Sequence, residues 1–559
     1  MSNSSRVVWR RVLGFGLSAL LSALAGCNGS APPTSPDGML PRGGTPPNVI
    51  FILIDTLRAD RLGAYGHKGR LTPTLDSIAA EGVLLENCEA QAPWTLASVG
   101  SLFSACYPSV HKATDYFSAE AERRGERPKV SKFNDEFDTL AEALRALGYQ
   151  TAGVSANPFV IKEFGYAQGF DYFNNAFGDN GVTGLQVNQR AIEWLDQRQS
   201  RQPLFLYLHY MDAHGPYDAP GEFADELLAE FERKPNKRLL TETEYKAINE
   251  YLKETIPGSN PEKFRPMRKY WEYWVAAYEA GVREADYHVG RMIAELKKRG
   301  LWDNAYVIIT ADHGEAFCEH GYWEHGPGLY ESELHVPMLL RWPGVLPRGE
   351  RIGDVVELFD IMPTILEQFR RPLGDTVQGQ SFLELLQGKK RNRPGTAFAE
   401  AVKDERRRQW AFRRDNYKLI RTHVLPDPND EDGPKDVQKG YELYDCVSDR
   451  DEQRNLNDAR FRTAELAKLA HELTLLLDQQ IVANERQKPG LVVEHVVLSE
   501  SQEQGLKGHG YIQKGSGESQ DEPRQPTTSN STTRPAQSQP VTSQPTTRPA
   551  AGAGPSAQP

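Results

Sequence analysis

The segment VIFILID, residues 49–55, is an apolar run rich in β-branched residues that ends in an aspartate. Such a run, apolar on both faces, is typical of a strand buried in a parallel sheet. Two similar runs, LFLYL at 204–208 and YVIIT at 306–310, also lead into polar, ionisable residues. Because these short runs alternate with helical patterns, the sequence predicts an α/β fold with a mostly parallel sheet covered by helices.

The residues that follow these strands are the first candidates for a functional site. Ligands of open α/β sheets bind at the carboxyl ends of the strands, so we expect Asp55, the segment 209–214 and the pair Asp312-His313 at one rim. Asp55 alone is weak evidence, since an aspartate after a strand is more often a helix N-cap. Asp312-His313 is more specific, because a carboxylate and an imidazole stand side by side before Gly314.

The N-terminal segment is typical of an export signal. Arg6, Arg10 and Arg11 precede an apolar run at 12–24, which is too short for a comfortable membrane span. The run ends in Leu-Ala-Gly-Cys, which resembles a bacterial lipobox in which Cys27 carries the lipid. The alternative is an ordinary signal peptide in which Cys27 has no role.

Changes of composition divide the chain into five predicted segments. Pro-, Gly- and Ser-rich stretches mark a flexible tether and a tail with almost no large apolar residue. The α/β pattern fills the first half of the remainder, and short strands with one helix predict a small α+β subdomain after it. The predicted segments are a lipoprotein signal peptide at 1–27, a tether at 28–47, a catalytic domain at 48–345, a C-terminal subdomain at 346–490 and a largely disordered tail at 491–559.

Composition excludes one class of partner. The chain has 559 residues, 39% of them hydrophobic, and a formal net charge of −11. This acidic balance argues against nucleic acid, which needs a basic face, so an anionic substrate would require a local positive site. The five cysteines show no CxxC spacing, so the sequence suggests neither a zinc knuckle nor a redox motif. The sequence leaves the pairing of the cysteines beyond Cys27 open; these are Cys88, Cys106, Cys318 and Cys446.

The segment APWTLASVGSLFSACYP, residues 92–108, resembles the signature of sulfatases, members of the alkaline phosphatase superfamily. In that signature a nucleophile opens a helix, Ser and Arg follow, and Tyr-Pro closes the motif. On this spacing Thr95 falls on the nucleophile, Ser98 on the Ser and Val99 on the Arg. With Asp55 and Asp312-His313, the resemblance extends over about residues 48–456.

Departures from the sulfatase pattern change the expected chemistry. Classical sulfatases convert a Cys or Ser nucleophile to formylglycine, whereas Thr95 cannot become an aldehyde, Val99 removes the adjacent Arg, and Thr56 breaks the paired aspartates. The remaining set resembles the single-metal site of threonine-using relatives, such as lipoteichoic acid synthases and phosphoethanolamine transferases. The resemblance therefore implies one divalent metal, bound by Asp55, Thr95, Asp312 and His313. Ca²⁺, Mn²⁺ and Zn²⁺ all fit these donors.

Two histidines complete the expected site. The resemblance places His325 where a Lys or His contacts the oxyanion, and His214 where a His-x-Pro motif faces the substrate and can protonate the leaving oxygen. Arg58 has two interpretations, a phosphate clamp or a partner of Asp55 or Asp60, and we favour the second. A two-zinc site would also need Asp212, whose Asp-x-His spacing differs from the usual Asp-x-x-x-His.

These observations lead to an expected function and two alternatives. We expect a hydrolase of sulfate or phosphate esters, with a glycan or lipid head group as substrate, held by its lipid anchor at the bacterial cell envelope, in the outer membrane or periplasm. One alternative is a transferase of phospho-head groups, although such relatives carry several membrane helices that this sequence does not show. The other is a catalytically silent binding lipoprotein, which would have no reason to keep all four metal-site residues.

Overall fold

A computed structural model describes residues 46–114, 127–175, 183–234 and 271–508, apart from short gaps at 322, 392, 402–406, 427–436 and 488–489. The predicted signal peptide with Cys27 and most of the tether lie outside the described residues. Among the described helices, none combines the length and the apolar character that crossing a membrane requires.

An eight-stranded sheet in the order β11-β2-β10-β7-β1-β6-β4-β5 forms the centre of the molecule. Its strands are β1 (Asn48–Ile54), β2 (Val83–Glu89), β4 (Gln150–Ser155), β5 (Tyr172–Asn174), β6 (Leu204–Tyr210), β7 (Ala305–Thr310), β10 (His335–Arg341) and β11 (Glu350–Glu357). The pairs β1·β6, β1·β7, β4·β6, β4·β5 and β11·β2 are parallel, and β10 runs antiparallel to both β7 and β2. The predicted mostly parallel sheet is confirmed.

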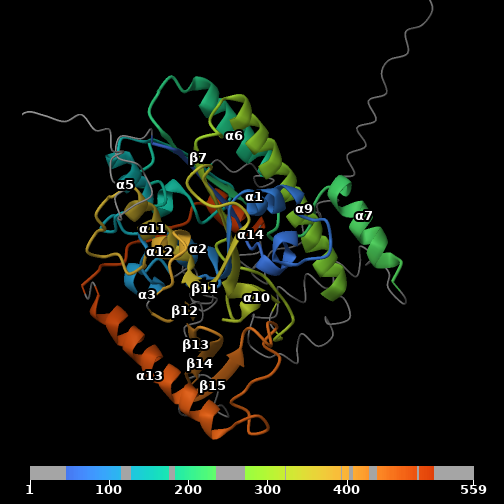
Figure 1. Cartoon of the computed structure of the whole chain (residues 1–559), viewed down its shortest axis with the longest axis vertical. Helices are drawn as coiled ribbons and strands as arrows, with labels where there is room; N and C mark the ends of the chain where they lie inside the picture. Colours follow the sequence, from blue (N-terminus) through green and yellow to red (C-terminus); the bar gives the residue numbers. More distant parts are fainter. Residues whose placement is uncertain are drawn as a thin grey trace, which may run out of the picture. The chain divides into compact units, whose positions relative to one another are not determined.

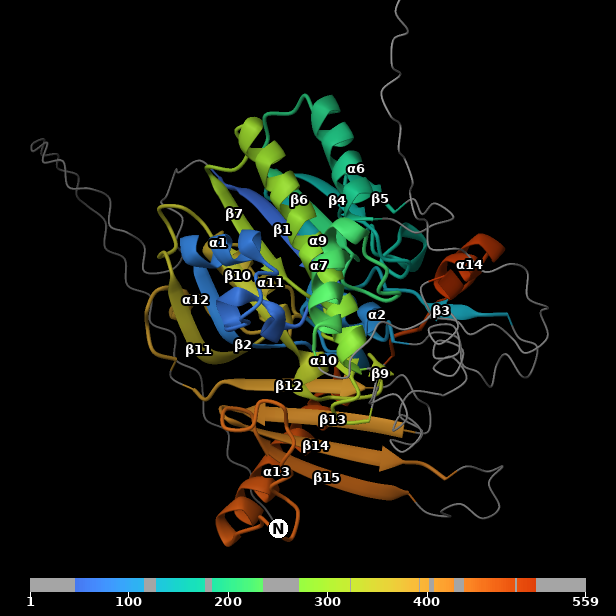
Figure 2. The same cartoon turned by 90° about the vertical axis from the view of Figure 1, so that its right-hand side faces the viewer.

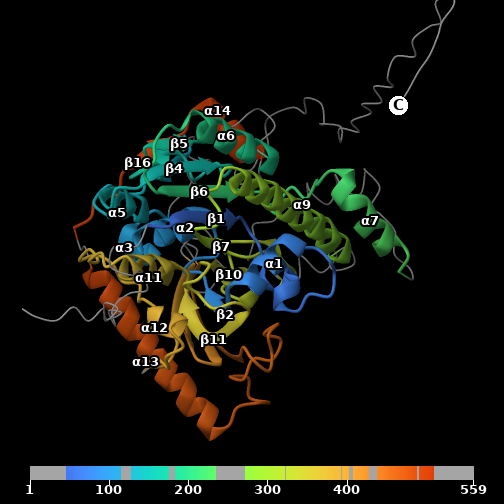
Figure 3. The same cartoon turned by 45° about the horizontal axis from the view of Figure 1, so that its top comes forward.

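Helices cover both faces of this sheet (Figure 3). The helices α9 (Trp271–Lys298) and α1 (Pro73–Glu81) lie on one face, and α2 (Thr95–Ser104), α5 (Leu140–Ala146) and α11 (Ile361–Gln368) lie on the other. The remaining helices of this part are α3 (Pro108–His111), α6 (Gly184–Gln197), α7 (Gly221–Glu232), α10 (Glu331–Leu334) and α12 (Leu383–Leu386). Figure 1 shows how the long α9 spans this layer beside α6 and α7.

A second, antiparallel sheet follows in the order β12-β13-β14-β15, below the large sheet in Figure 2. Its strands are β12 (Thr396–Ala401), β13 (Arg407–Arg414), β14 (Tyr417–Val424) and β15 (Gln438–Asp445), and α13 (Ala464–Arg486) packs on β13 and β14. The predicted α+β subdomain is confirmed. The boundary at residue 345 does not coincide with a change of sheet, because β11 pairs with β2 of the large sheet.

The chain beyond residue 490 is more structured than predicted. β16 (His495–Val497) pairs antiparallel with β3 (Lys129–Ser131), and α14 (Glu500–Gly508) follows it. Leu498 and Leu506 are almost fully buried, which anchors this segment to the core. The prediction of a tail from residue 491 was therefore wrong for its first part, while residues 509–559 lie outside the described residues.

Candidate active site

The carboxyl ends of four adjacent parallel strands meet at one edge of the large sheet. Asp55 follows β1, Asn157 lies just beyond β4, His209 is the penultimate residue of β6, and Asp312 follows β7. All four side chains are fully buried. The strand order therefore gathers residues that are far apart in the sequence, as the rule for open sheets predicts.

Thr95 is the first residue of α2, as the signature predicts for the nucleophile. Its Oγ1 lies 3.3 Å from Nε2 of His313 and 3.3 Å from Nδ2 of Asn157. Ser98, one turn later, donates its hydroxyl to the backbone oxygen of Asp312 at 2.6 Å. This bond ties the start of α2 to the end of β7, so the hydroxyl of Thr95 points at the group formed by Asp55, Asp312 and His313.

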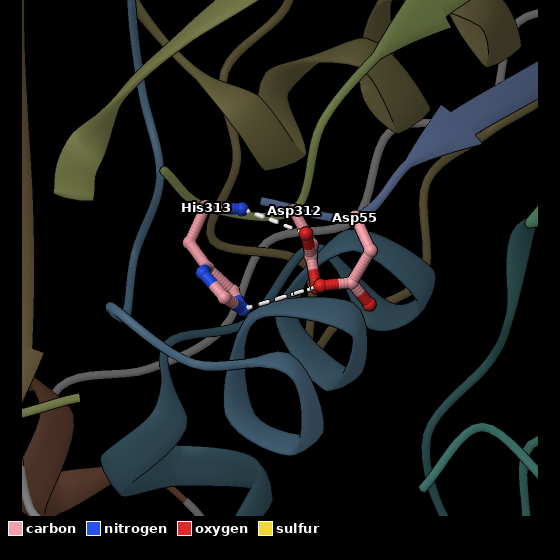
Figure 4. Close-up of side chains that lie close together, drawn as sticks. All are labelled: Asp55, Asp312 and His313. Carbon is pink, nitrogen blue, oxygen red and sulfur yellow. Dashed lines mark hydrogen bonds and ion pairs between the residues drawn. The ribbon is translucent and has the colours of Figure 1, made fainter. Parts of the chain in front are cut away.

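The side chains of Asp55, Asp312 and His313 offer three donor atoms within 4.8 Å of one another (Figure 4). Within the described residues, Asp55 Oδ1 and Asp312 Oδ2 are buried without a hydrogen-bond partner. His313 donates Nδ1–H to the oxygen of Gly314 at 2.9 Å, which leaves the lone pair of Nε2 available. Two orphaned carboxylate oxygens and a free imidazole nitrogen are donors that fit one divalent cation.

The two carboxylates have opposite pKa shifts. Burial raises the pKa of Asp55, but the hydrogen bond from His209 and the charges of the nearby imidazoles outweigh it and hold the pKa below its usual value. Burial and the charge of Asp55 raise the pKa of Asp312, against the opposing effect of His313. Two buried negative charges this close repel each other, and a bound cation between them would remove this repulsion.

Thr56, which stands where the sulfatase pattern has a second aspartate, supports the turn after β1. Its φ of 57° is in the left-handed region, which is rare for a β-branched residue. The turn directs Thr56 Oγ1 back to the oxygen of Asp55 at 2.7 Å and its N–H to Asp312 Oδ1 at 3.3 Å. The side chain at this position therefore supports the turn, and only the backbone reaches the metal-binding group.

The two predicted histidines lie beside this group. The ring centroid of His325 is 4.5 Å from that of His313 and 5.0 Å from that of His214. His325 Nδ1 is 2.9 Å from Oε1 of the buried Glu315, which fixes its ring. His214 and His325 are each at most 6% exposed, whereas Thr95 is fully buried. The three imidazoles therefore lie together beside the carboxylates of Asp55 and Asp312.

Arg58 and Asp212 lie outside this group. The guanidinium of Arg58 forms a bidentate pair with Asp60 and contacts Glu319, which is the structural role we favoured over a phosphate clamp. Asp212 accepts the N–H of Gly184 at 2.9 Å and lies near Glu284 and His288. Because Asp212 belongs to this separate group, a second metal beside Asp55 has no support from it.

Two residues of the site were not predicted as such. Asn157 donates Nδ2–H to Asp55 Oδ2 at 2.6 Å, and His209 Nε2 lies 3.0 Å from the same oxygen. His209 lies at the end of a strand that the sequence predicts, and this position was the signal that could have assigned it to the site. Asn157 also lies just beyond the end of a strand, but the sequence did not predict β4. Cys88, Cys106, Cys318 and Cys446 are buried, and no disulfide joins them in the described part of the chain.

The fold and this site define a metal-dependent ester hydrolase. The sequence matches the family described as Sulfatase over residues 47–370, more than half of its length, and the chain belongs to the sulfatase family. Residues 318–480 also match the family described as N-sulphoglucosamine sulphohydrolase, C-terminal.

Individual relatives agree with this assignment. An N-acetylglucosamine-6-O-sulfatase of Bacteroides thetaiotaomicron is 23% identical over 78% of this chain and 86% of its own. An arylsulfatase of Clostridium perfringens is 24% identical over 61% and 78%. A solved structure in complex with D-glucosamine-2-N,6-O-disulfate superposes with a TM-score of 0.62 at 21% identity, over 80% of this chain and 99% of that one. The phosphonate monoester hydrolase of Agrobacterium radiobacter gives 0.58 at 18%, over 78% and 96%.

Proposed function

We propose that this sulfatase-family hydrolase cleaves sulfate or phosphate esters with Thr95 as the nucleophile. One observation carries the proposal: the Thr95 hydroxyl lies 3.3 Å from His313 Nε2, in a group that also presents orphaned oxygens of Asp55 and Asp312. A threonine hydroxyl is a poor nucleophile at neutral pH, so it needs help to ionise. A cation held by these residues would stabilise the alkoxide, and the start of α2 adds positive potential.

The first half of the reaction transfers the sulfuryl or phosphoryl group to the protein. Thr95, having lost its hydroxyl proton to solvent, forms a bond from Oγ1 to sulfur or phosphorus, while the bond to the ester oxygen breaks in line with it. His214 gives a proton to that leaving oxygen. His325, held by Glu315, lies where it can face the oxygens on which negative charge develops.

The second half regenerates the enzyme. Water attacks the same sulfur or phosphorus atom, the bond to Thr95 Oγ1 breaks, and inorganic sulfate or phosphate is released. His214, now without its proton, is the group within the site that can accept one from this water. The alcohol product leaves before this step, so the cycle consumes one ester and one water.

Two classes of ester, sulfate and phosphate, fit the proposed reaction. A relative named N-acetylglucosamine-6-O-sulfatase and a neighbour bound to a glucosamine disulfate support a sulfated glycan. A neighbour named phosphonate monoester hydrolase supports phosphoryl chemistry on the same fold. The threonine, which replaces an aldehyde-forming residue, gives phosphoryl transfer equal weight with sulfuryl transfer.

Turnover of an ester panel tests this function. The full chain would be assayed on aryl sulfates, phosphate monoesters and phosphodiesters with Ca²⁺, Mn²⁺ or Zn²⁺, beside Thr95→Ala and Thr95→Ser. We expect one ester class to be cleaved, Thr95→Ala to lose at least about 10³-fold in kcat and Thr95→Ser to keep part of it. Equal turnover by Thr95→Ala would refute the mechanism. Silence on every ester would favour a head-group transferase or a binding protein.

We also propose that the chain is a lipoprotein of the cell envelope, on the support of the basic, apolar and lipobox-like order of residues 1–27. A lipid on Cys27 would hold the enzyme on the membrane and leave the catalytic part to reach envelope substrates. Expression of wild type and Cys27→Ser in a bacterial host, followed by membrane fractionation, tests this. We expect the wild type in the membrane fraction and the variant outside it, and equal membrane association of the two would contradict the anchor.

A further inference from the structure

The two oxygens of Asp55 have different surroundings. Oδ2 accepts two hydrogen bonds, from Asn157 Nδ2 at 2.6 Å and from His209 Nε2 at 3.0 Å. Oδ1 accepts none within the described residues and lies 3.9 Å from His313 Nε2. A carboxylate with one saturated and one free oxygen cannot rotate without losing two bonds. Asp55 therefore presents a single oxygen in a fixed direction.

Asn157 has its amide orientation set by the backbone. Its Oδ1 accepts the N–H of Phe159 at 2.7 Å, so Nδ2 must face the opposite way. There it donates one hydrogen to Asp55 Oδ2 and approaches Thr95 Oγ1 at 3.3 Å with the other. An amide N–H aimed at a hydroxyl oxygen favours negative charge on that oxygen. Asn157 therefore touches both a metal-ligand candidate and the nucleophile.

His209 is oriented by a residue two positions earlier on the same face of β6. The Tyr207 hydroxyl lies 3.1 Å from His209 Nδ1, and all three members of the series Tyr207, His209 and Asp55 are at most 1% exposed. Because Oδ2 of the ionised Asp55 can only accept, Nε2 carries the hydrogen and Nδ1 accepts from Tyr207. Within the described residues, His209 bonds to Asp55 and Tyr207 and makes no hydrogen bond to Thr95.

We propose that His209 is a positioning residue that holds Asp55 as a one-oxygen metal ligand, and that Asn157 does the same while also stabilising the reacting oxygen of Thr95. The second part rests on the proposed function, in which Thr95 is the nucleophile. Outer hydrogen-bond partners of metal ligands typically contribute about 10–100-fold to metal affinity or activity. Of the two residues, only Asn157 contacts Thr95. Saturating metal should therefore restore kcat when His209 is replaced, but not when Asn157 is replaced.

The experiment compares matched variants in two assays. Binding of Mn²⁺, Zn²⁺ or Ca²⁺ alone to the full chain is measured by calorimetry, and kcat is measured at saturating metal on the ester that the wild type cleaves. The variants are His209→Leu, Asn157→Leu, the donor-retaining His209→Gln and the mild Tyr207→Phe. Asn188→Leu is the control, because Asn188 is also a buried amide, bonded to the oxygen of His288 and to the Tyr210 hydroxyl, away from Asp55.

We expect His209→Leu and Asn157→Leu each to weaken metal binding by about 10–100-fold, with His209→Gln close to wild type and Tyr207→Phe in between. Saturating metal should return kcat of His209→Leu to near the wild-type value, whereas Asn157→Leu should stay about 10–100-fold lower. Asn188→Leu should bind metal as the wild type does.

Each contrary result would refute one part of the proposal, either the positioning of Asp55 or the action of Asn157 on Thr95. Wild-type metal affinity in both His209→Leu and Tyr207→Phe would refute the positioning of Asp55, as would equal loss in Asn188→Leu or no metal binding by the wild type. Wild-type kcat of Asn157→Leu at saturating metal would refute its action on Thr95. If the wild type binds metal but cleaves no ester, the proposed function and the role at Thr95 fail together, while the calorimetry still decides the role of His209.

Discussion

Asp312 is a candidate metal ligand whose two oxygens have different surroundings. Its Oδ1 accepts N–H groups from His313 at 2.9 Å and from Thr56 at 3.3 Å, while its Oδ2 is buried without a hydrogen bond in the described residues and lies 3.3 Å from His313 Nε2. A carboxylate in this position, whose pKa is raised by burial and by Asp55, costs free energy in the metal-free fold. The cost is understandable only if the residue serves binding.

Asp312→Asn should separate stability from binding. The amide oxygen can still accept the two N–H bonds, but the buried charge beside Asp55 is removed. We expect metal affinity to fall by more than about 100-fold, because a ligand is lost rather than an outer partner. The Tm of the metal-free variant at neutral pH should equal or exceed that of the metal-free wild type. Calorimetry and thermal unfolding in chelator measure both; unchanged metal affinity would remove Asp312 from the site.

The site residues were predictable from their position after strands and within a spaced motif more than from residue type alone. Asp55, Thr95, Asp312 and His313 could be expected together because each lies shortly after a strand or opens a helix of a known motif. Asn157 could not, since its role depends on the N–H of Phe159, which bonds to Oδ1 and thereby sets the direction of Nδ2. Such orientation is a property of the folded backbone, and no single-sequence pattern records it.

Elements differ in how visible they are in the sequence. β1 and β7 are continuous apolar runs and were predictable, whereas β4 reads QTAGVS, with small and polar residues that are nonetheless buried. Small residues are required in β4 because the neighbouring strand packs closely: a Cβ on Gly153 would lie 2.7 Å from the ring of Phe173 on β5. The antiparallel direction of β10 was equally hidden, because apolar pattern gives burial and not direction.

α2 and α3 offer a pH prediction through His111. This ring is 1% exposed, lies against Gly100 and contacts Ser101 Oγ at 3.1 Å, and burial lowers its pKa to about 3. In the unfolded chain a histidine titrates near 6.5. Between these values the unfolded state binds one proton more, so stability contributed by neutral His111 is present above about pH 6.5 and is lost as pH falls towards 3.

His111→Gln should therefore flatten the acid limb of the stability curve. One group contributes about 1.4 kcal/mol per pH unit, so the free energy of unfolding of the wild type should fall relative to the variant by about 2–3 kcal/mol from pH 6.5 to 4.5. Denaturant unfolding at the two pH values gives this difference directly. A constant difference between the proteins across that range would show that His111 has the same pKa in the native and unfolded states.

At the scale of the whole molecule, the small sheet is joined to the large one through buried charges. Lys418 of β14 contacts Glu331 of α10 at 2.8 Å and Glu452 at 2.8 Å, and Arg413 of β13 pairs with Glu331 and with Glu89 of β2. All five side chains are at most 9% exposed. Burial and the charge of Glu331 raise the pKa of Glu452 to about 8 despite Lys418, so Glu452 depends on Lys418 to keep its charged form favourable.

Breaking this network should destabilise the junction between the two sheets. Lys418→Met keeps the length of the side chain but leaves Glu331 with Arg413 alone and Glu452 without a cation, and removal of one partner from a buried pair costs about 3–5 kcal/mol. The control is Arg460→Met, which removes the exposed ion pair with Asp458 and should have little effect. Denaturant unfolding measures both midpoints. Glu331 lies two residues before Glu333, whose backbone oxygen accepts the N–H of Gly314 next to His313. Lys418→Met should therefore also weaken metal binding. A variant with the midpoint and metal affinity of the wild type would mean that apolar packing, and not this network, joins the sheets.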